Sequence, residues 1–383
     1  MHRYNVMTFA QAIGAKILPG PLDELRPEDN PPRARGTAPE ASARVRTARG
    51  PKMFTSDGGY VLPHEHIVLD ARVWWEGPGD WNDLDPLDGA GLDTARIARF
   101  PQAVVRENMV LSDWYVAAQE LRLARAAGCQ LVADLTVHGL DPHRTLAVRA
   151  ADLAGLDVVL GVGRYLDPTL SDQDRATTPE QLVDEWIAQV EEGWEGLLPG
   201  IIGEIGTSET ITPSEETSLR AAARVQLASG LAINVHVHPY ARQALAAIRL
   251  LDQEGADLAR VAISHCDGDL DLDWLRRLLA TGVYVEMDMF GTGPERIVAG
   301  RGYPSDSERV ETAVALCAEG FSTRLLFSHD ICHRNSLHRN GGWGYDHIPR
   351  TIVPALRERL GDPLAEQLTS LNALRLLDWR GPI

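Results

Sequence analysis

The 383-residue sequence has few cysteines, no long apolar run and few positive charges. Its four cysteines form no Cys-x-x-Cys pair, and their spread indicates reduced thiols in a cytosolic protein. No apolar run approaches the roughly 20 residues that are needed to cross a bilayer. The segment Phe9–Leu18 is broken by Gln11, Gly14 and Lys16, unlike the apolar core of a secretion signal. We therefore predict a cytoplasmic protein.

Negative charge dominates, with 54 Asp and Glu against 37 Lys and Arg and a formal net charge of -17. Nucleic acids and anionic membrane surfaces require basic patches, so neither is expected as a partner. We expect a small-molecule substrate and a homodimer. Hydrophobic residues make up 44% of the chain, enough for a large core in either one barrel or two domains.

Short apolar runs alternate with longer amphipathic segments from about Val45 onward. Segments such as Ser218–Ala228 and Val310–Ala318 have helical spacing. Alternating strands and helices imply parallel strands, and eight such units favour a closed barrel over an open sheet. The predicted fold is an α/β protein, a (β/α)8 TIM barrel over residues 45–383. Its eight predicted strands are Tyr60–Leu62, Leu131–Leu135, Val158–Val162, Ile201–Ile205, Ala232–Val237, Val261–Ser264, Val283–Met287 and Leu325–Ser328.

Residues 1–44 are predicted to be an irregular N-terminal extension. The stretch from Pro19 to Arg44 is rich in Pro, Arg, Glu and Ala. Such a composition offers little apolar surface to bury, so this stretch is expected to lie outside the barrel.

The most informative motif is an apolar run that leads directly into His64-Glu65-His66. In an extended strand, side chains two residues apart point to the same side, so both imidazoles can reach one metal ion while Glu65 turns away. A single pair of this kind is more often a polar strand end than a ligand set. Four more residues of ligand type stand at the ends of other apolar runs: Glu204, His236, His265 and Asp330.

Four imidazoles and two carboxylates at the mouth of one barrel suit two divalent ions with a bridging carboxylate. A separate structural role would explain any one of these residues. Six residues at equivalent positions on five strands instead favour a shared metal site. We expect two ions per chain, with zinc first and manganese, cobalt or iron as alternatives. The two charges would produce a metal-bound hydroxide near neutral pH, and Asp330 is the predicted catalytic proton acceptor.

Several segments resemble the phosphotriesterase-related family of the amidohydrolase superfamily, from about Val45 to the C-terminus. The resemblance implies that His64, His66 and Asp330 hold a buried ion and that His236 and His265 hold a more exposed one. Its most specific pieces are Thr-Ala-Arg-Gly-Pro at 47–51, Gly-Ile-Ile-Gly-Glu-Ile-Gly-Thr-Ser at 200–208, Val-Ala-Ile-Ser-His-Cys-Asp at 261–267, and Asp330-Ile331 followed by Asn-Gly-Gly-Trp-Gly-Tyr-Asp at 340–346.

The bridging group is predicted to be Glu204. The Gly-Glu-Ile-Gly-Thr-Ser segment resembles the phosphotriesterase homology protein subgroup, in which a glutamate bridges the ions. Many other relatives bridge with a carboxylated lysine, but the only lysines here are Lys16 and Lys52, both upstream of His64. No lysine can therefore take that role, and a carboxylate must.

A second His-x-His, His236-Val237-His238, leaves the fifth strand ambiguous, because alternation puts both imidazoles on one side. The segment Ala-Ile-Asn-Val-His at 232–236, which resembles the fifth strand of the family, ends on His236. Pro239 also restricts His238 to an extended or turn conformation beyond the strand. We therefore predict His236 as the ligand and His238 as a residue that lines the pocket or begins the next helix.

The substrate class stays open between three kinds of compound. Hydrolysis of a carboxylic ester or lactone is the first prediction. The alternatives are an amidase for N-acyl amino acids or similar amides, as the resemblance to animal relatives implies, and a phosphotriesterase of low activity. Phosphotriesterases of the family carry His after the Asp of the seventh strand, and lactonases carry Arg. Here Met289 follows Asp288, which counts against efficient hydrolysis of triesters and acyl-homoserine lactones.

The candidate substrate-binding residues are predicted for different reasons. Tyr165 matches a tyrosine that faces the pocket in the family. Arg164 and Arg334 are candidate anchors for a carboxylate, sulfonate or phosphate. His238 follows the fifth strand, and Trp75, with Trp74 and Trp343, is a candidate for an apolar wall. A non-catalytic barrel is the remaining alternative, but six ligands including a bridge exceed what a closed structural site uses.

Overall fold

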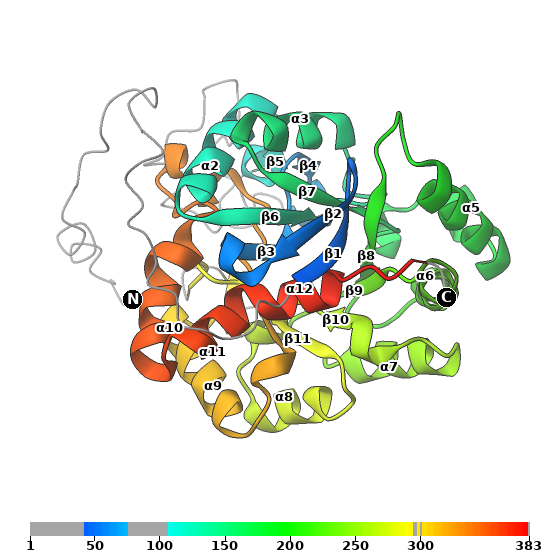
Figure 1. The fold of residues 1–383 in the computed structure, drawn as a ribbon. Coiled ribbons are helices and arrows are strands. Elements are labelled where there is room, and N and C mark those ends of the chain that lie inside the picture. Colours follow the sequence, from blue (N-terminus) through cyan, green and yellow to red (C-terminus); the bar gives the residue numbers. More distant parts are fainter. Residues whose placement is uncertain (1–41, 76–105, 294–296, 299–300, 382–383) are drawn as a thin grey trace, which may run out of the picture. The chain divides into compact units, whose positions relative to one another are not determined.

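The computed structural model describes residues 42–75, 106–293, 297–298 and 301–381. Eight parallel strands form one sheet in the order β14-β11-β10-β9-β8-β7-β6-β3, which confirms the predicted (β/α)8 barrel (Figure 1). The barrel strands are β3 (Tyr60–Glu65), β6 (Cys129–Asp134), β7 (Asp157–Val162), β8 (Pro199–Thr207), β9 (Ala232–Val237), β10 (Val261–Ile263), β11 (Tyr284–Met287) and β14 (Leu325–Phe327).

Helices follow the barrel strands and cover the outside of the sheet (Figure 1). The sequence signals for their ends are those expected: Thr212 caps α6 in a reciprocal pair with Glu215, and Gly230 ends the helix in the left-handed region. The described α-helices are α2 (Trp114–Ala126), α3 (Arg144–Ala154), α4 (Asp172–Arg175), α5 (Pro179–Glu192), α6 (Pro213–Ser229), α7 (Ala244–Gln253), α8 (Leu272–Leu279), α9 (Asp306–Ala318), α10 (Val353–Leu360), α11 (Asp362–Glu366) and α12 (Asn372–Leu377).

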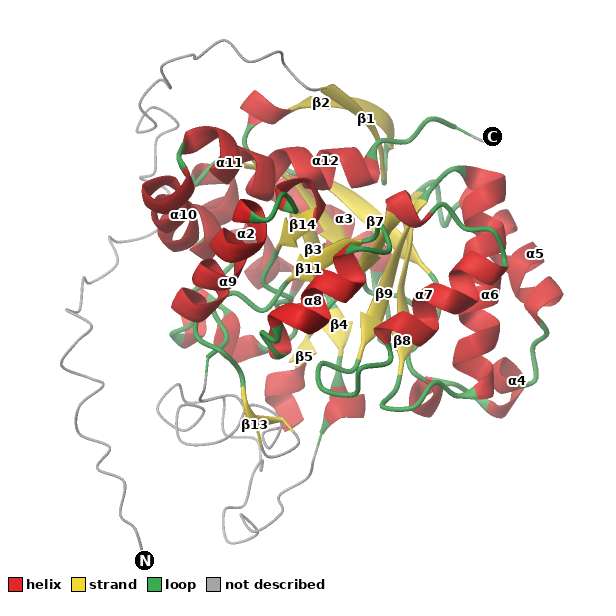
Figure 2. Ribbon diagram, turned by 90° about the horizontal axis from the view of Figure 1, so that it is seen from below, coloured by secondary structure: helices red, strands yellow, loops and turns green. Residues whose placement is uncertain are grey.

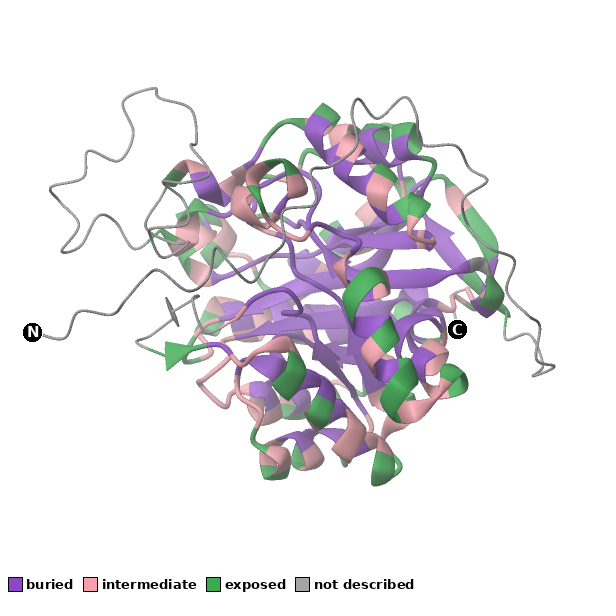
Figure 3. Ribbon diagram, turned by 90° about the vertical axis from the view of Figure 1, so that its left-hand side faces the viewer, coloured by how far each residue is buried: buried purple, intermediate pink, exposed green. Residues whose placement is uncertain are grey.

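Side chains of the strands alternate between two buried clusters. Those that point outward pack against the helices, whereas those that point inward fill the barrel. Figure 3 shows the strands as almost entirely buried. The inner cluster includes Val61, Leu131, Val159, Ile201, Ala232, Ala262, Tyr284 and Leu326.

The N-terminal end of the barrel is closed by a hairpin and the last helix (Figure 2). Strands β1 (Ser42–Thr47) and β2 (Gly50–Thr55) pair antiparallel, and α12 packs beside β1 onto the inner cluster. The Ala48 backbone donates to the Val158 carbonyl at 2.8 Å and accepts from Leu198 at 3.0 Å. The Thr-Ala-Arg-Gly segment therefore serves to attach this closure.

Two further short strand pairs complete the described structure. β4 (Leu69–Asp70) pairs with β5 (Val110–Leu111) near the opposite end of the barrel from β1 (Figure 2). β12 (Ile297–Val298) pairs with β13 (Arg301–Gly302). Within the described ranges, no helix is long and apolar enough to cross a membrane.

The seam between the first and last barrel strands is closed by side chains rather than by ladder bonds in the part of the chain described. The Ser328 hydroxyl donates to the His64 carbonyl at 2.7 Å and accepts from the His64 backbone N–H at 3.2 Å. The buried carboxylate of Glu65 then reaches across to the chain that follows β14. Glu65 turns away from the cluster of ligand-type residues, as predicted, but it has this second role.

The expected N-terminal extension, residues 1–44, lies outside the described residues except at its end. Residues 42–44 form the first half of β1, and Ala43 is buried in the inner cluster.

Candidate metal centre

All six residues predicted as metal ligands converge at the C-terminal ends of the strands, and all six are buried. Glu204 lies at the middle of the group. Its Oε1 is 2.7 Å from His236 Nδ1, 3.1 Å from His265 Nε2 and 3.5 Å from His64 Nε2. Its Oε2 is 3.8 Å from His66 Nε2. A single carboxylate thus faces all four imidazoles.

A bulge in β8 turns Glu204 into the barrel. Ile202 packs in the outer cluster, so strict alternation would also point residue 204 outward. The pairing with β9 shifts between Ile202 and Ile205, and Ile205 returns to the outer cluster. Gly203 makes this bulge with φ of 117°, where a Cβ would lie 2.2 Å from the Asn234 carbonyl oxygen. The glycine is required because any side chain would collide there.

A similar shift sets the histidine pair. Val61 points inward and Leu62 outward, so alternation alone would send His64 to the outside. The pairing of β3 with β6 shifts between Leu62 and Glu65, and His64 and His66 enter the barrel.

Two cluster residues have left-handed backbones. His265 has φ of 56° and Asp330 has φ of 51°, and they belong to five such non-glycine residues in the described chain. This conformation costs on the order of 1–3 kcal/mol per residue and is concentrated at functional sites. In both residues it turns a side chain beyond a strand end towards the common centre.

The converging atoms form two groups that could each hold a cation, and Glu204 belongs to one and faces the other. His64, His66 and Asp330 form one group, and Glu204, His236 and His265 form another. His64 Nε2 is buried, faces Glu204 and Asp330 and has no hydrogen-bond partner in the described structure. His265 Nε2 lies only 2.8 Å from His236 Nδ1. A buried imidazole nitrogen without a partner, such as His64 Nε2, is what a bound cation satisfies.

The electrostatics favour ionised carboxylates at this centre. Burial opposes the charge of Glu204, but His236 and His64 hold the pKa of this carboxyl well below its usual value. Burial likewise opposes the charge of Asp330, and the hydrogen bond from His66 lowers its pKa. Both groups are therefore available as anionic ligands.

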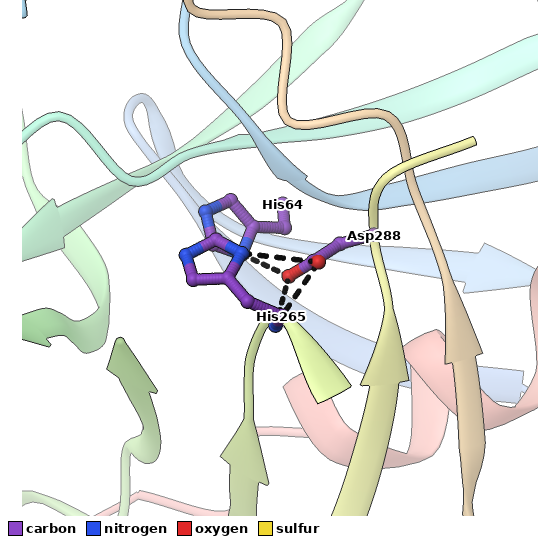
Figure 4. Close-up of side chains that lie close together, drawn as sticks. All are labelled: His64, His265 and Asp288. Carbon is purple, nitrogen blue, oxygen red and sulfur yellow. Dashed lines mark hydrogen bonds and ion pairs between the residues drawn. The ribbon is translucent and has the colours of Figure 1, made fainter. Parts of the chain in front are cut away.

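Asp288 connects the two groups from behind (Figure 4). Its Oδ2 is 3.1 Å from His64 Nδ1 and its Oδ1 is 3.1 Å from His265 Nδ1. It also accepts from the His265 backbone N–H at 3.0 Å, which supports the left-handed turn. On the opposite side, His66 Nδ1 is 2.9 Å from Thr136 Oγ1, which donates to Asp134 at 2.5 Å. Such partners fix the rotation of ligand imidazoles.

Glu65 holds the backbone on both sides of Asp330. Its carboxylate accepts from the backbone N–H of His329 at 2.9 Å and of Ile331 at 3.0 Å. Its Oε1 also lies 2.9 Å from Ser328 Oγ, and it pairs with His329 Nδ1 at 2.7 Å. His329 itself pairs with Glu65 and Ile348 and serves this structural contact.

Tyr165 and Trp74 lie against the cluster. The Tyr165 hydroxyl is 3.3 Å from His236 Nδ1 and accepts from Trp74 Nε1 at 2.9 Å. The Trp74 ring lies 5.7 Å from the His236 ring. Burial raises the pKa of Tyr165 well above its usual value, so the phenol stays protonated as a hydrogen-bond donor.

The structure does not bring the two predicted arginine anchors to this cluster. Arg164 donates to the Asp174 carbonyl at 3.0 Å and to Glu185 at 2.9 Å, beside α4 and α5. It follows β7 in the outward position, next to the inward Tyr165. Arg334 donates to the Val110 carbonyl at 2.6 Å. It lines a separate cavity of about 490 Å³.

The other two predicted substrate residues lie at different distances from the strand ends. His238 is half-buried one residue beyond β9, and burial lowers its pKa. Trp75 is partly exposed and packs under Arg106, whose carbon Cζ is 5.3 Å from the ring. Trp74, rather than Trp75, is the tryptophan at the cluster.

Sequence reasoning missed the supporting carboxylates of Glu65, Asp288 and Glu286. Asp288 and Glu286 stand in the inward register of β11, with Tyr284, which alternation from the buried strand could have shown. Glu65 gives no such signal, because its partners lie more than 260 residues further along the chain.

A (β/α)8 barrel that gathers four imidazoles and two carboxylates at its C-terminal end defines a class, and this protein is a metal-dependent hydrolase. Residues 43–367 match the phosphotriesterase family, and the chain belongs to that family. Enzymes of this family use a binuclear metal centre, which agrees with the groups of His, Asp and Glu gathered here.

Individual relatives are similar over most of the chain. The N-acetyltaurine hydrolase of Danio rerio is 31% identical over 329 residues, covering 84% of this chain and 93% of the relative. A resiniferatoxin-binding protein from Rhodobacter sphaeroides has a TM-score of 0.82 at 31% identity, over 88% of this chain and 95% of that one. The phosphotriesterase homology protein from Escherichia coli, complexed with phosphate in its active site, has a TM-score of 0.69 at 26% identity, over 84% and 99%.

Proposed function

We propose that this protein hydrolyses the amide bond of small N-acylated amino acids or amino sulfonates of the N-acetyltaurine type. The observation that carries the proposal is the shared centre around Glu204, in a chain whose relatives include N-acetyltaurine hydrolases at 31% and 33% identity. Sequence reasoning placed an ester or lactone first and an amide second. These relatives favour the amide.

We infer that the ligands are those predicted. His64, His66 and Asp330 would hold one ion, His236 and His265 the other, and Glu204 would bridge them. Zinc is the first candidate because the set is rich in imidazole and the groups are small. When bound, two divalent cations would polarise the amide carbonyl and lower the pKa of a water molecule between them.

Asp330 is proposed as the catalytic proton carrier. Its Oδ1 is 3.3 Å from His66 Nε2 and its Oδ2 is 4.0 Å from His265 Nδ1, so the carboxylate lies between the two groups. There it can accept a proton from the water whose oxygen attacks the carbonyl carbon. The same proton then goes to the amine nitrogen as the C–N bond breaks. Tyr165 donates a hydrogen bond to the substrate from beside His236.

The negatively charged end of such a substrate is proposed to meet His238. The backbone N–H of Tyr240 donates to His238 Nδ1 at 3.3 Å, so the proton of the neutral ring sits on Nε2. That N–H can donate to a sulfonate or carboxylate oxygen. Arg301 lies 5.1 Å from the Tyr240 ring and adds positive charge on the same side. Arg164 and Arg334 are excluded from this proposal because their contacts lie elsewhere.

The test is a hydrolysis screen of zinc-loaded and manganese-loaded protein. N-acetyltaurine and N-acetyl amino acids are compared with lactones, carboxylic esters and phosphotriesters, and released amine is quantified. We expect the highest kcat/KM on an anionic amide, and a loss of about 10²–10⁴-fold in Asp330→Asn at unchanged fold. Faster turnover of lactones or esters would favour the alternative chemistry. No turnover in a protein with two bound ions would refute the proposal.

A further inference from the structure

A carboxylate that the proposed reaction does not use lies inside the barrel beneath the metal centre. Glu286 is in the inward register of β11 and is fully buried. Its Oε2 is 3.1 Å from His64 Nδ1. Its Oε1 is buried and has no hydrogen-bond partner in the described residues. A fully buried carboxylate with one oxygen unpartnered is costly to fold, so its contacts through the other oxygen need an explanation.

The proton on His64 links Glu286 to the centre. His64 Nε2 faces Glu204 and Asp330 and has no other partner in the described chain, so it is the nitrogen available to a cation. Binding through Nε2 requires a lone pair there and places the ring proton on Nδ1. That proton points to Glu286, Asp288 and Ser264, each 3.1 Å away.

Of the two carboxylates, Glu286 is better placed than Asp288 to accept the hydrogen bond from this N–H group. Asp288 already accepts the backbone N–H of His265 and faces its Nδ1. Glu286 is instead held towards His64 by two neutral neighbours. Asn234 Nδ2 donates to Glu286 Oε2 at 2.7 Å, and Ser264 Oγ lies 2.9 Å from the same oxygen.

We propose that Glu286 is the positioning residue of the His64–His66–Asp330 subsite: it fixes the tautomer and rotation of His64 and strengthens the hold of this subsite on its cation. A carboxylate behind a ligand imidazole makes the nitrogen a stronger donor to the metal. Glu286 then supports His64 alone, whereas Asp288 stands behind both His64 and His265. The inference rests on the metal centre of the proposed function but not on the identity of its substrate.

The test measures metal dissociation from the zinc-loaded full-length protein with the chromophoric chelator 4-(2-pyridylazo)resorcinol. His66→Ala identifies which of the two release steps belongs to the His64–His66–Asp330 subsite. In Glu286→Gln we expect the dissociation constant of that step to rise about 10–100-fold, with the other step nearly unchanged. Glu286→Asp keeps the charge further from His64, so it should raise the same constant less than Glu286→Gln does.

The control is Glu120→Gln, because Glu120 is also buried and accepts two backbone N–H groups, from His338 and Arg339, remote from the centre. Unfolding of the metal-free proteins is measured in parallel. If Glu286→Gln lowers metal-free stability but leaves both dissociation constants unchanged, Glu286 is only structural and the proposal is overturned. Should that variant not fold, unchanged constants in Glu286→Asp overturn it equally.

The outcomes separate this inference from the proposed function because metal release needs no substrate. A selective loss of affinity in a protein inactive on amides would support the role of Glu286 and reject the amide. If the protein hydrolyses amides and Glu286→Gln keeps its metal affinity, the proposed function is supported and the role of Glu286 is rejected. A wild-type chain that binds no ion would overturn both.

Discussion

Replacing Glu65 by Gln should disturb both the closure of the barrel and the position of Asp330. The carboxylate accepts from the backbone N–H groups of His329 and Ile331 and from the side chain of His329. The Ile348 backbone N–H donates to His329 Nε2 at 3.1 Å, so Nδ1 carries the ring proton and donates to Glu65. These three N–H groups therefore require an acceptor, and glutamine offers one oxygen where glutamate offers two.

The least costly placement of the glutamine puts its NH2 in the position of Oε2, facing the Ile331 N–H. This loses one hydrogen bond to a charged acceptor, worth about 1.5–3 kcal/mol, and buries two opposed donors at a cost of about 1–3 kcal/mol. The expected loss of stability is about 2.5–6 kcal/mol, which corresponds to roughly 3–8 °C in Tm for a chain of this size. Because Ile331 follows Asp330 directly, turnover should also fall, by about 10–100-fold.

Two measurements separate these effects. Urea unfolding of the metal-free protein, followed by circular dichroism, gives the stability. Turnover of the best substrate from the screen, at saturating metal, gives the effect on Asp330. Glu120→Gln is the matched control, because it removes the charge from another buried carboxylate that accepts two backbone N–H groups. It should lose stability and keep its turnover.

The reasoning would be refuted by a Glu65→Gln protein as stable as the wild type. It would also be refuted if Glu65→Gln and Glu120→Gln lowered turnover equally, since the loss would then follow stability alone.

Three further predictions concern single side chains. Glu204→Gln removes the charge between the imidazoles at constant shape, so elemental analysis should find at most one ion per chain and turnover should fall; two ions with full turnover would contradict the bridge. His236→Ala should release an ion and abolish turnover, whereas His238→Ala should mainly raise KM for an anionic amide; reversed phenotypes would exchange the two roles. Burial raises the pKa of the Asp174 carboxyl, but hydrogen bonds from Ser171 and His138 outweigh this effect and hold the pKa at about 2. Its stabilisation is complete above pH of about 4 and is lost as the pH falls towards 2, so Asp174→Asn should flatten urea-unfolding stability in this window, and an unchanged slope would speak against it.

The sequence alone determined the fold and the membership of the candidate site. Each predicted barrel strand corresponds to an observed one, because parallel strands buried on both faces leave continuous apolar runs. The six ligand-type residues stand next to these runs, and in a barrel the C-terminal ends of all strands meet at one mouth. Alternation also placed His64 and His66 on one side.

Only the tertiary structure decided which side that is. Strict alternation from Leu62 and Ile202 would send His64 and Glu204 to the helices, and the bulges that reverse this are set by pairing with neighbouring strands. Tertiary contacts also withdrew Arg164 and Arg334 from the site and brought Trp74 to it in place of Trp75.

The supporting carboxylates show the same limit most clearly. Glu65 meets its partners across the seam of the barrel, and Glu286 meets His64 across its interior, at 222 residues of separation. The residue types and their periodicity are local properties of the chain, so the sequence carries them. Which buried charges face one another depends on how the sheet closes, because contacts between distant segments exist only once the barrel has formed.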